Sequence, residues 1–217
     1  MHFEFLVEDA SGKKAMEVLA PKLLGDTDTF RIFPYKGNGH LPKGLKPKTD
    51  ARKRILLDQL PKLINGYGRT PDCGVIVIIC DLDSRDYMAF MAQLESLLNS
   101  CTKKPKDTLF CLAVEEFEAW YLGDLAAIRK AYPNAKEYIL NRYENDSICG
   151  TWELLADAIY KGGRIELSKK GQVGVEKYAW AEKISPFMDV SKNASPSFNE
   201  MRKQLHSLKS KYKGASL

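Results

Sequence analysis

The chain has 217 residues, of which 44% are hydrophobic and 28% are charged, and its formal net charge is +5. This composition is ordinary for a globular protein and excludes a disordered chain, and the length suits one sizeable core with an appendage or two small domains. No apolar run approaches the roughly 20 residues of a membrane helix, and the N-terminus MHFEFLVEDA has neither a basic region nor a cleavage site, so we expect a cytoplasmic protein without membrane contact.

The first 131 residues alternate strand-like and helix-like patterns. The strand-like runs are FEFLV, FRIF, VIVIIC and LFCLAV, and each is followed by a segment with apolar residues at helical spacing. Four βα units in series predict an α/β fold, with a mostly parallel sheet of about four strands and helices on both faces.

Beyond Tyr132 the pattern changes to short helices separated by glycine and proline. We interpret residues 132–217 as a helical extension packed on a core of residues 1–131, not as an independent domain. In the last predicted helix, Ser197 and Glu200 have the spacing of an S-x-x-E capping box.

Acidic residues follow three of the predicted strands. Because the carboxyl ends of parallel strands meet at one edge of a sheet, we expect these side chains to gather there. Residues i and i+2 of an extended segment share a face, so the two aspartates of the DLD motif are expected to point the same way. The residues are Glu8 after FEFLV, Asp81 and Asp83 in VIVIICDLD, and Glu115 and Glu118 after LFCLAV.

Such a cluster predicts a divalent cation. Two carboxylates about 4 Å apart repel by roughly 4 kcal/mol at an effective dielectric near 20, and a third adds to that. The five cysteines form no CxxC pair and the three histidines have no ligand spacing, so the expected metal is a hard ion held by oxygen, Mg²⁺ or Mn²⁺.

Each acidic motif also has a structural interpretation. Asp83 or Ser84 is a candidate cap for the helix that begins near Tyr87. Glu115 and Glu118 share one helical face and are candidate ligands of a second metal, or they form an acidic first turn that complements the helix dipole.

Basic residues concentrate between Lys36 and Arg54 among glycines and prolines. This segment predicts contact with a polyanion such as the backbone of DNA or RNA, and the alternative is a solvated loop. The candidate nucleic-acid-binding residues are Lys36, Lys43, Lys46, Lys48 and Arg52.

A glutamate after the first strand, a DxD after a later one and a basic loop between them resemble the Toprim domain of topoisomerases, primases and nucleases. More narrowly, LVEDASG, DLDSRD, VEEFEAWYLGD and SPSF are similar to a family of small bacterial Toprim-like proteins of unknown function that are often encoded beside an ABC-type ATPase. The resemblance implies a Toprim-like Rossmannoid fold, Glu8 as general acid or base, and Asp81 and Asp83 as holders of Mg²⁺ or Mn²⁺. Many Toprim motifs have glycine after the glutamate, whereas Asp9 stands here and either joins the site or caps the next helix.

The leading hypothesis from the sequence is a metal-dependent nuclease, or a related phosphodiester-transfer enzyme, acting on DNA or RNA as the effector of an ATPase-linked bacterial defence system. The alternative is a catalytically inactive Toprim-like binding module that docks on the partner ATPase. A nucleotide-binding protein is a weaker option, because no glycine-rich phosphate motif follows a strand.

Overall fold

A computed structural model describes residues 1–70 and 73–214 of the chain. Its centre is one sheet in the order β2-β1-β3-β4, with every neighbouring pair parallel. This confirms the predicted four-stranded parallel sheet. The strands are β1 (His2–Val7), β2 (Thr29–Pro34), β3 (Val75–Asp81) and β4 (Asp107–Ala113).

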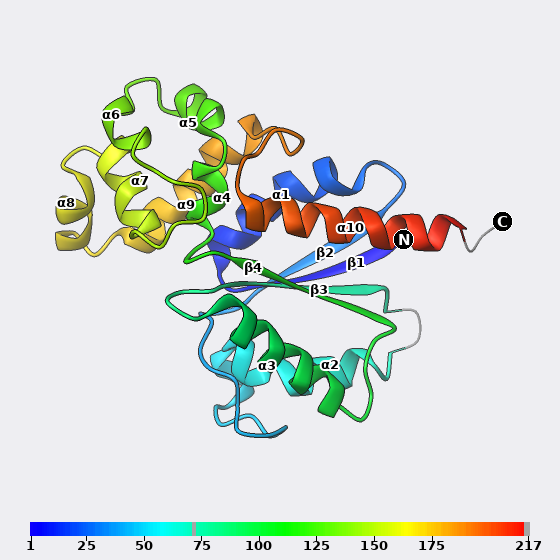
Figure 1. The fold of residues 1–217 in the computed structure, drawn as a ribbon. Coiled ribbons are helices and arrows are strands. Elements are labelled where there is room, and N and C mark those ends of the chain that lie inside the picture. Colours follow the sequence, from blue (N-terminus) through cyan, green and yellow to red (C-terminus); the bar gives the residue numbers. More distant parts are fainter. Residues whose placement is uncertain (71–72, 215–217) are drawn as a thin grey trace.

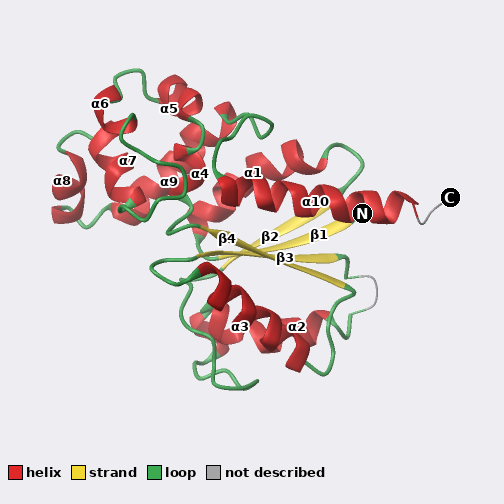
Figure 2. Ribbon diagram, in the orientation of Figure 1, coloured by secondary structure: helices red, strands yellow, loops and turns green. Residues whose placement is uncertain are grey.

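Helices cover both faces of the sheet, as the βα pattern predicts. Figures 1 and 2 show α1 (Ala10–Leu24) and α10 (Pro196–Gly214) on one face and α2 (Leu56–Tyr67) and α3 (Tyr87–Ser100) on the other. Side chains of β3 alternate between the two cores: Val77 packs toward α1, and Ile78 packs toward α2 and α3. A strand buried on both faces must be apolar at every position, which is why VIVIIC is an unbroken apolar run.

The remaining helices gather beyond the carboxyl ends of the strands (Figure 1). They share one hydrophobic core with the α1 face of the sheet, to which Trp120, Trp180 and Phe198 all belong. The set consists of α4 (Glu118–Leu122), α5 (Leu125–Ala131), α6 (Glu137–Leu140), α7 (Thr151–Ile159), α8 (Gly163–Lys169) and α9 (Val173–Ile184), with short 3₁₀ turns at η1 (Ala51–Lys53) and η2 (Ser185–Phe187).

Helix α10 begins differently from the prediction. The hydroxyl of Ser195 accepts a hydrogen bond from the N–H of Phe198 at 3.2 Å, so Ser195 caps the helix. The hydroxyl of Ser197 accepts instead from the indole N–H of Trp120 at 3.0 Å, which ties α10 to α4. The predicted capping box is therefore wrong, because its serine is used in a tertiary contact.

Within the described residues, no helix is both long and apolar enough to cross a membrane.

Candidate functional site

Glu8 is the first residue after β1, and its side chain crosses to the end of β3. Its carboxylate Oε2 accepts a hydrogen bond from the backbone N–H of Asp81 at 3.3 Å. The next residue, Asp9, has another task, because its Oδ1 accepts from the N–H of Gly12 at 2.7 Å and caps α1. Of the two alternatives for Asp9, the structure shows the helix cap.

Asp81 is the last residue of β3, and its carbonyl oxygen is held from two sides. It accepts a hydrogen bond from Nδ2 of Asn38 at 2.7 Å and another from Nη1 of Arg85 at 3.3 Å. Nη2 of Arg85 also donates to the carbonyl of Gly39 at 3.2 Å. The loop after β2 and the turn after β3 therefore close around the carboxyl ends of β1 and β3.

The two carboxylates of Glu8 and Asp81 are difficult to ionise together. Burial raises the pKa of Glu8 to about 7, against the N–H of Asp81, which lowers it, and the charges of Asp83 and Asp9 add to the rise. Burial, followed by the charge of Glu8, raises the pKa of Asp81 well above its usual value. Close carboxylates of this kind titrate as a pair, and a nearby positive charge would favour their ionised forms.

Asp83 does not continue the strand. β3 ends at Asp81, and Asp83 has a left-handed backbone with φ of 53°, so the expected extended geometry of the DLD motif is wrong. The Asp83 carboxylate is half exposed and pairs with Nη1 of Arg85 at 2.9 Å. Helix α3 is capped by Asp86, whose side chain accepts from the N–H of Ala89 at 2.8 Å, so neither Asp83 nor Ser84 serves as its cap.

The carboxylate of Glu115 binds the N-terminus of a helix far along the chain. It also has a left-handed backbone, with φ of 60°, and its carboxylate accepts hydrogen bonds from the N–H groups of Cys149, Gly150 and Thr151 at 3.3, 2.8 and 2.8 Å. These N–H groups form the N-terminus of α7, where a negative charge is favourable. The structure thus turns Glu115 away from the cluster of Glu8 and Asp81.

Glu118 lies on α4 and is almost fully buried, at 2% exposure. The ammonium of Lys177, from α9, lies 3.2 Å from a carboxylate oxygen of Glu118 and 3.2 Å from one of Glu116. Burial raises the pKa of Glu116 to about 7, although Lys177 lowers it. Burial acts to lower the pKa of Lys177, but the charges of Glu118, Glu116 and Asp81 outweigh it and hold that pKa above its usual value. Sequence analysis missed both Glu116 and Lys177, although the VEE motif contained the first of them.

As they stand in residues 1–70 and 73–214, no three His, Cys, Asp or Glu side chains form a group that could hold a metal ion. The chemistry of the donor set at Glu8 and Asp81 nevertheless suits a hard cation: both donors are carboxylates, and both have raised pKa values that a cation would lower. Asp83 is close enough for its charge to act on Glu8, and its half-exposed side chain is the third candidate. Glu115 and Glu118 do not fit such an ion, since the carboxylate of Glu115 is bound by N–H groups at the start of α7 and that of Glu118 is paired with Lys177.

The predicted basic loop begins at this site and then leaves it. Its first part is tied to β1, because the N–H of Gly37 donates to the carbonyl of Glu8 at 3.0 Å. Further along, the buried carboxylate of Asp58 accepts from the N–H groups of Lys48 and Thr49 at 2.8 and 2.9 Å, which fastens the loop to α2. Arg52 forms an ion pair with Asp50 at 2.9 Å. Lys36, Lys43, Lys46 and Lys48 are exposed, and in the described part of the chain none of them forms an ion pair.

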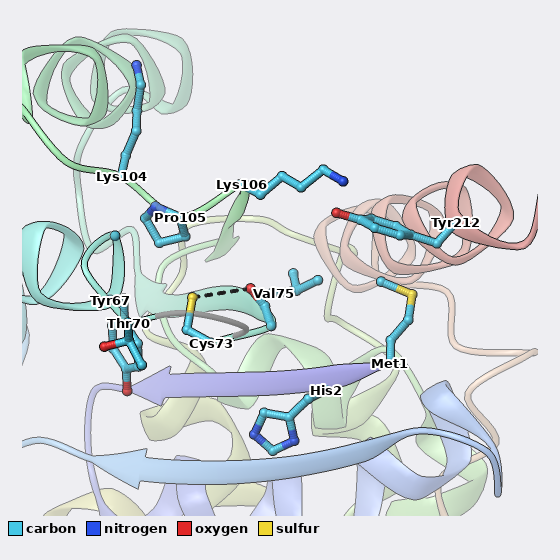
Figure 3. A pocket seen from close by; sticks show the side chains of 12 residues that line it. Met1, His2, Tyr67, Thr70, Cys73, Val75, Lys104, Pro105, Lys106 and Tyr212 are labelled. Atoms are coloured by element: carbon cyan, nitrogen blue, oxygen red, sulfur yellow. Dashed lines mark hydrogen bonds between the residues drawn. The ribbon is translucent and has the colours of Figure 1, made fainter. Parts of the chain in front are cut away.

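A hollow of about 420 Å³ lies at the opposite edge of the sheet. Figure 3 shows its wall, which includes His2 at the start of β1, Val75 at the start of β3 and Lys106 just before β4. The ammonium of Lys106 lies over the ring of Tyr212, 4.7 Å from its centre. Because parallel strands place all their carboxyl ends at the other edge, this hollow is separate from the site of Glu8 and Asp81.

Comparison with known proteins gives one match. A family model described as a domain of unknown function (DUF4276) matches residues 7–206, which include Glu8, Asp81 and Lys177. No curated protein and no solved structure matches the chain.

Proposed function

The chain belongs to the DUF4276 family, and we propose that it is a metal-dependent nuclease, or a related phosphodiester-transfer enzyme, that acts on DNA or RNA. The observation that carries the proposal is the meeting of Glu8 and Asp81 at the carboxyl edge of the sheet, with a raised pKa at both. Structural carboxylates are usually paired with cations or bound by several N–H groups, whereas strongly perturbed ones at a sheet edge are typical of functional sites.

The order of the motifs supports a Toprim-like assignment. A glutamate after β1 and a DxD at the end of β3 come from neighbouring strands, and the basic loop leaves β2 on the other side of β1. This is the arrangement that the resemblance to Toprim domains implies. In that resemblance the glutamate takes part in proton transfer and the aspartates hold the metal.

The proposed metal is Mg²⁺ or Mn²⁺, held by Glu8 and Asp81 with Asp83 as a third donor. Bound there, a divalent cation would supply positive charge to the scissile phosphate and lower the pKa of an attacking water. Glu8 is also the proposed proton acceptor, because the resemblance gives the glutamate this role and its carboxylate would lie beside a water bound to the metal. Arg85 and Asn38 would hold the backbone of Asp81 in place from opposite sides.

The exposed lysines of the basic loop are the proposed contacts to the nucleic-acid backbone. Lys36, Lys43, Lys46 and Lys48 have no acidic partner among the described residues, so binding a phosphate would break no existing ion pair. Arg52, in contrast, would have to leave Asp50.

Calorimetric titration of the protein with MnCl₂ tests the metal site. We expect binding in the native chain and at least a hundredfold loss of affinity in Glu8→Gln and in Asp81→Asn. Glu17→Gln, a change to an exposed glutamate on α1, is the matched control and should bind as the native chain does.

Cleavage of single-stranded DNA, duplex DNA and RNA should then require Mn²⁺ or Mg²⁺ and fail in Glu8→Gln. Equal cleavage by the native chain and Glu8→Gln would contradict the assignment.

The second candidate function is an inactive binding module that docks on a partner, for which the resemblance suggests an ABC-type ATPase. One observation favours it: Glu116 and Glu118, which could serve a cation, are already paired with Lys177. Folded native protein that binds no Mn²⁺ at millimolar concentration would favour the module over the nuclease.

A further inference from the structure

Lys177 brings a positive charge to the carboxyl edge from outside the βα units. It lies on α9, and 61 residues separate it from Glu116. Only 15% of its side chain is exposed, and its ammonium is 3.2 Å from a carboxylate oxygen of Glu116 and 3.2 Å from one of Glu118. An ammonium group that is almost completely buried loses its hydration, which is unfavourable unless acidic partners compensate.

The position of the ammonium matches that of a bound cation. Glu116 and Glu118 stand just beyond the end of β4, the neighbour of β3, so their carboxylates lie beside Asp81 at the same edge. The charges of Glu118 and Glu116 both act on Asp81, and so does the charge of Lys177. Without Lys177, the carboxylates of Glu116 and Glu118 would have no positive charge between them, and close carboxylates attract a divalent ion.

We propose that the ammonium of Lys177 fills the place that Glu116 and Glu118 would otherwise offer to a second metal ion, so that the site takes one divalent cation per chain. The inference rests on the proposed function, because the single cation is the one assigned to Glu8 and Asp81. A metal ion needs carboxylate oxygens at about 2.0–2.2 Å, so it cannot share these two glutamates with an ammonium already in contact with both. The covalent link to α9 keeps the ammonium in place at any metal concentration.

This arrangement assigns Lys177 a further task in the proposed reaction. A phosphate at the carboxyl edge would meet the exchangeable charge of the metal, while the fixed charge of the ammonium offsets the repulsion from Glu116 and Glu118. The fixed charge would be present in the metal-free protein as well. The helical extension would then contribute directly to the site, and not only to the stability of the fold.

Calorimetric titration of the full chain with MnCl₂ gives the stoichiometry that decides the matter. We expect one Mn²⁺ per chain in the native protein and in Lys177→Arg, and two in Lys177→Met, because the uncharged side chain frees Glu116 and Glu118. Electron paramagnetic resonance provides a second readout, since two neighbouring Mn²⁺ ions broaden each other's spectrum. Two Mn²⁺ in the native chain, or no more Mn²⁺ in a folded Lys177→Met than in the native chain, would overturn the inference.

A second variant does not depend on how well Lys177→Met folds. Glu116→Gln keeps Lys177 and should bind one Mn²⁺ with an affinity within about threefold of the native value. A loss of more than thirtyfold would overturn the inference, because it would make Glu116 a ligand of the single ion. Native protein that binds no Mn²⁺ while Lys177→Met binds one would overturn the proposed function and leave the role of Lys177 standing.

Discussion

The carboxyl edge of the sheet has two halves that both contain buried carboxylates but differ in whether a lysine is paired with them. On the side of β1 and β3, Glu8 and Asp81 form no ion pair with any described residue, and their pKa values are raised. On the side of β4, Glu116 and Glu118 are paired with Lys177. The difference arises because Lys177, among the described residues, forms ion pairs with Glu116 and Glu118 but not with Glu8 or Asp81.

The two pairs of acidic residues differ in what their ionisation does to the stability of the fold. A fixed cation offsets part of the cost of ionising buried carboxylates, so Lys177 lowers the pKa of Glu116 against the effect of burial. Glu8 and Asp81 have no such partner, and ionising both of them destabilises the fold. Sites kept at such a cost are typically functional. The half without a fixed cation is therefore the better candidate for an exchangeable one.

The largest effect is expected from removing the fixed cation. Lys177→Met keeps most of the aliphatic stem and leaves the buried carboxylate of Glu118 without its partner, which typically costs about 3–5 kcal/mol of unfolding free energy. Urea denaturation at pH 7.5 followed by circular dichroism measures this loss. The ion pair of Lys14 with Glu182, also on α9, serves as the control, because its glutamate is 57% exposed and Lys14→Met should change the midpoint far less. Similar losses in both variants would show that Lys177 is not a special contact.

A smaller effect of opposite sign is expected on the other half of the edge. The pKa of Glu8 is raised from 4.5 to about 7 in the folded protein, so the folded chain binds the proton more tightly than the unfolded chain. Folding stability should fall as the pH rises between these two values and then level off above about pH 7. Glu8→Gln removes this loss and should be more stable than the native chain at pH 8, by at most about 3 kcal/mol, and not at pH 4.

Thermal unfolding at both pH values, with and without Mn²⁺, checks the expectation for Glu8. If the native chain binds the metal, added Mn²⁺ should stabilise it at pH 8 and leave Glu8→Gln nearly unchanged. A Glu8→Gln variant that is less stable than the native chain at pH 8 would mean that the carboxylate serves the fold. The contrast between the two halves would then be lost.

The fold was largely predictable from the sequence, because the two strands β3 and β4 contain nearly continuous apolar runs and all four strands alternate with helical patterns. VIVIIC and LFCLAV must be apolar on both faces of a covered parallel sheet, and the βα order fixes which ends of the strands share an edge. The same reasoning predicted that Glu8 and Asp81 would lie near each other. It failed at Asp83, since the sequence gives no sign that the strand ends at Asp81 and that a left-handed residue follows.

The rest of the site depends on contacts between distant segments. In VEKYAWAEKI, Lys177 has the pattern of an ordinary charged residue on a short helix, and only the packing of α9 against α1 and α5 brings it to Glu116. The partners of Glu115 follow it by about 35 residues, in a loop without periodicity. Local patterns contain no information on such pairings, whereas a lysine and two glutamates varying together among relatives would reveal one of them.

The next prediction concerns Glu115, because its two interpretations predict different effects of the same substitution. As the cap of α7 it accepts three N–H groups, so Glu115→Ala should cost about 1–2 kcal/mol of unfolding free energy. As a metal ligand it would instead lower the affinity for Mn²⁺. Denaturation and Mn²⁺ calorimetry on the same variant distinguish the two, and we expect lower stability with unchanged metal binding.

The smallest effects are expected from single residues of the basic loop, where the comparison between paired and unpaired charges recurs. Each phosphate contact contributes about 0.9 to the slope of the logarithm of the binding constant against the logarithm of the salt concentration on duplex DNA, and about 0.7 on single strands. Lys43→Ala and Lys48→Ala should each lower the slope by about that amount, because both ammonium groups are exposed and unpaired within the described chain. Arg52→Ala should lower it less, since its guanidinium is already held by Asp50. Fluorescence anisotropy with a labelled oligonucleotide in 50–300 mM KCl measures these slopes. Native slopes in Lys43→Ala and Lys48→Ala would show that these two lysines only face solvent, and the acidic edge would then need another partner to hold its substrate.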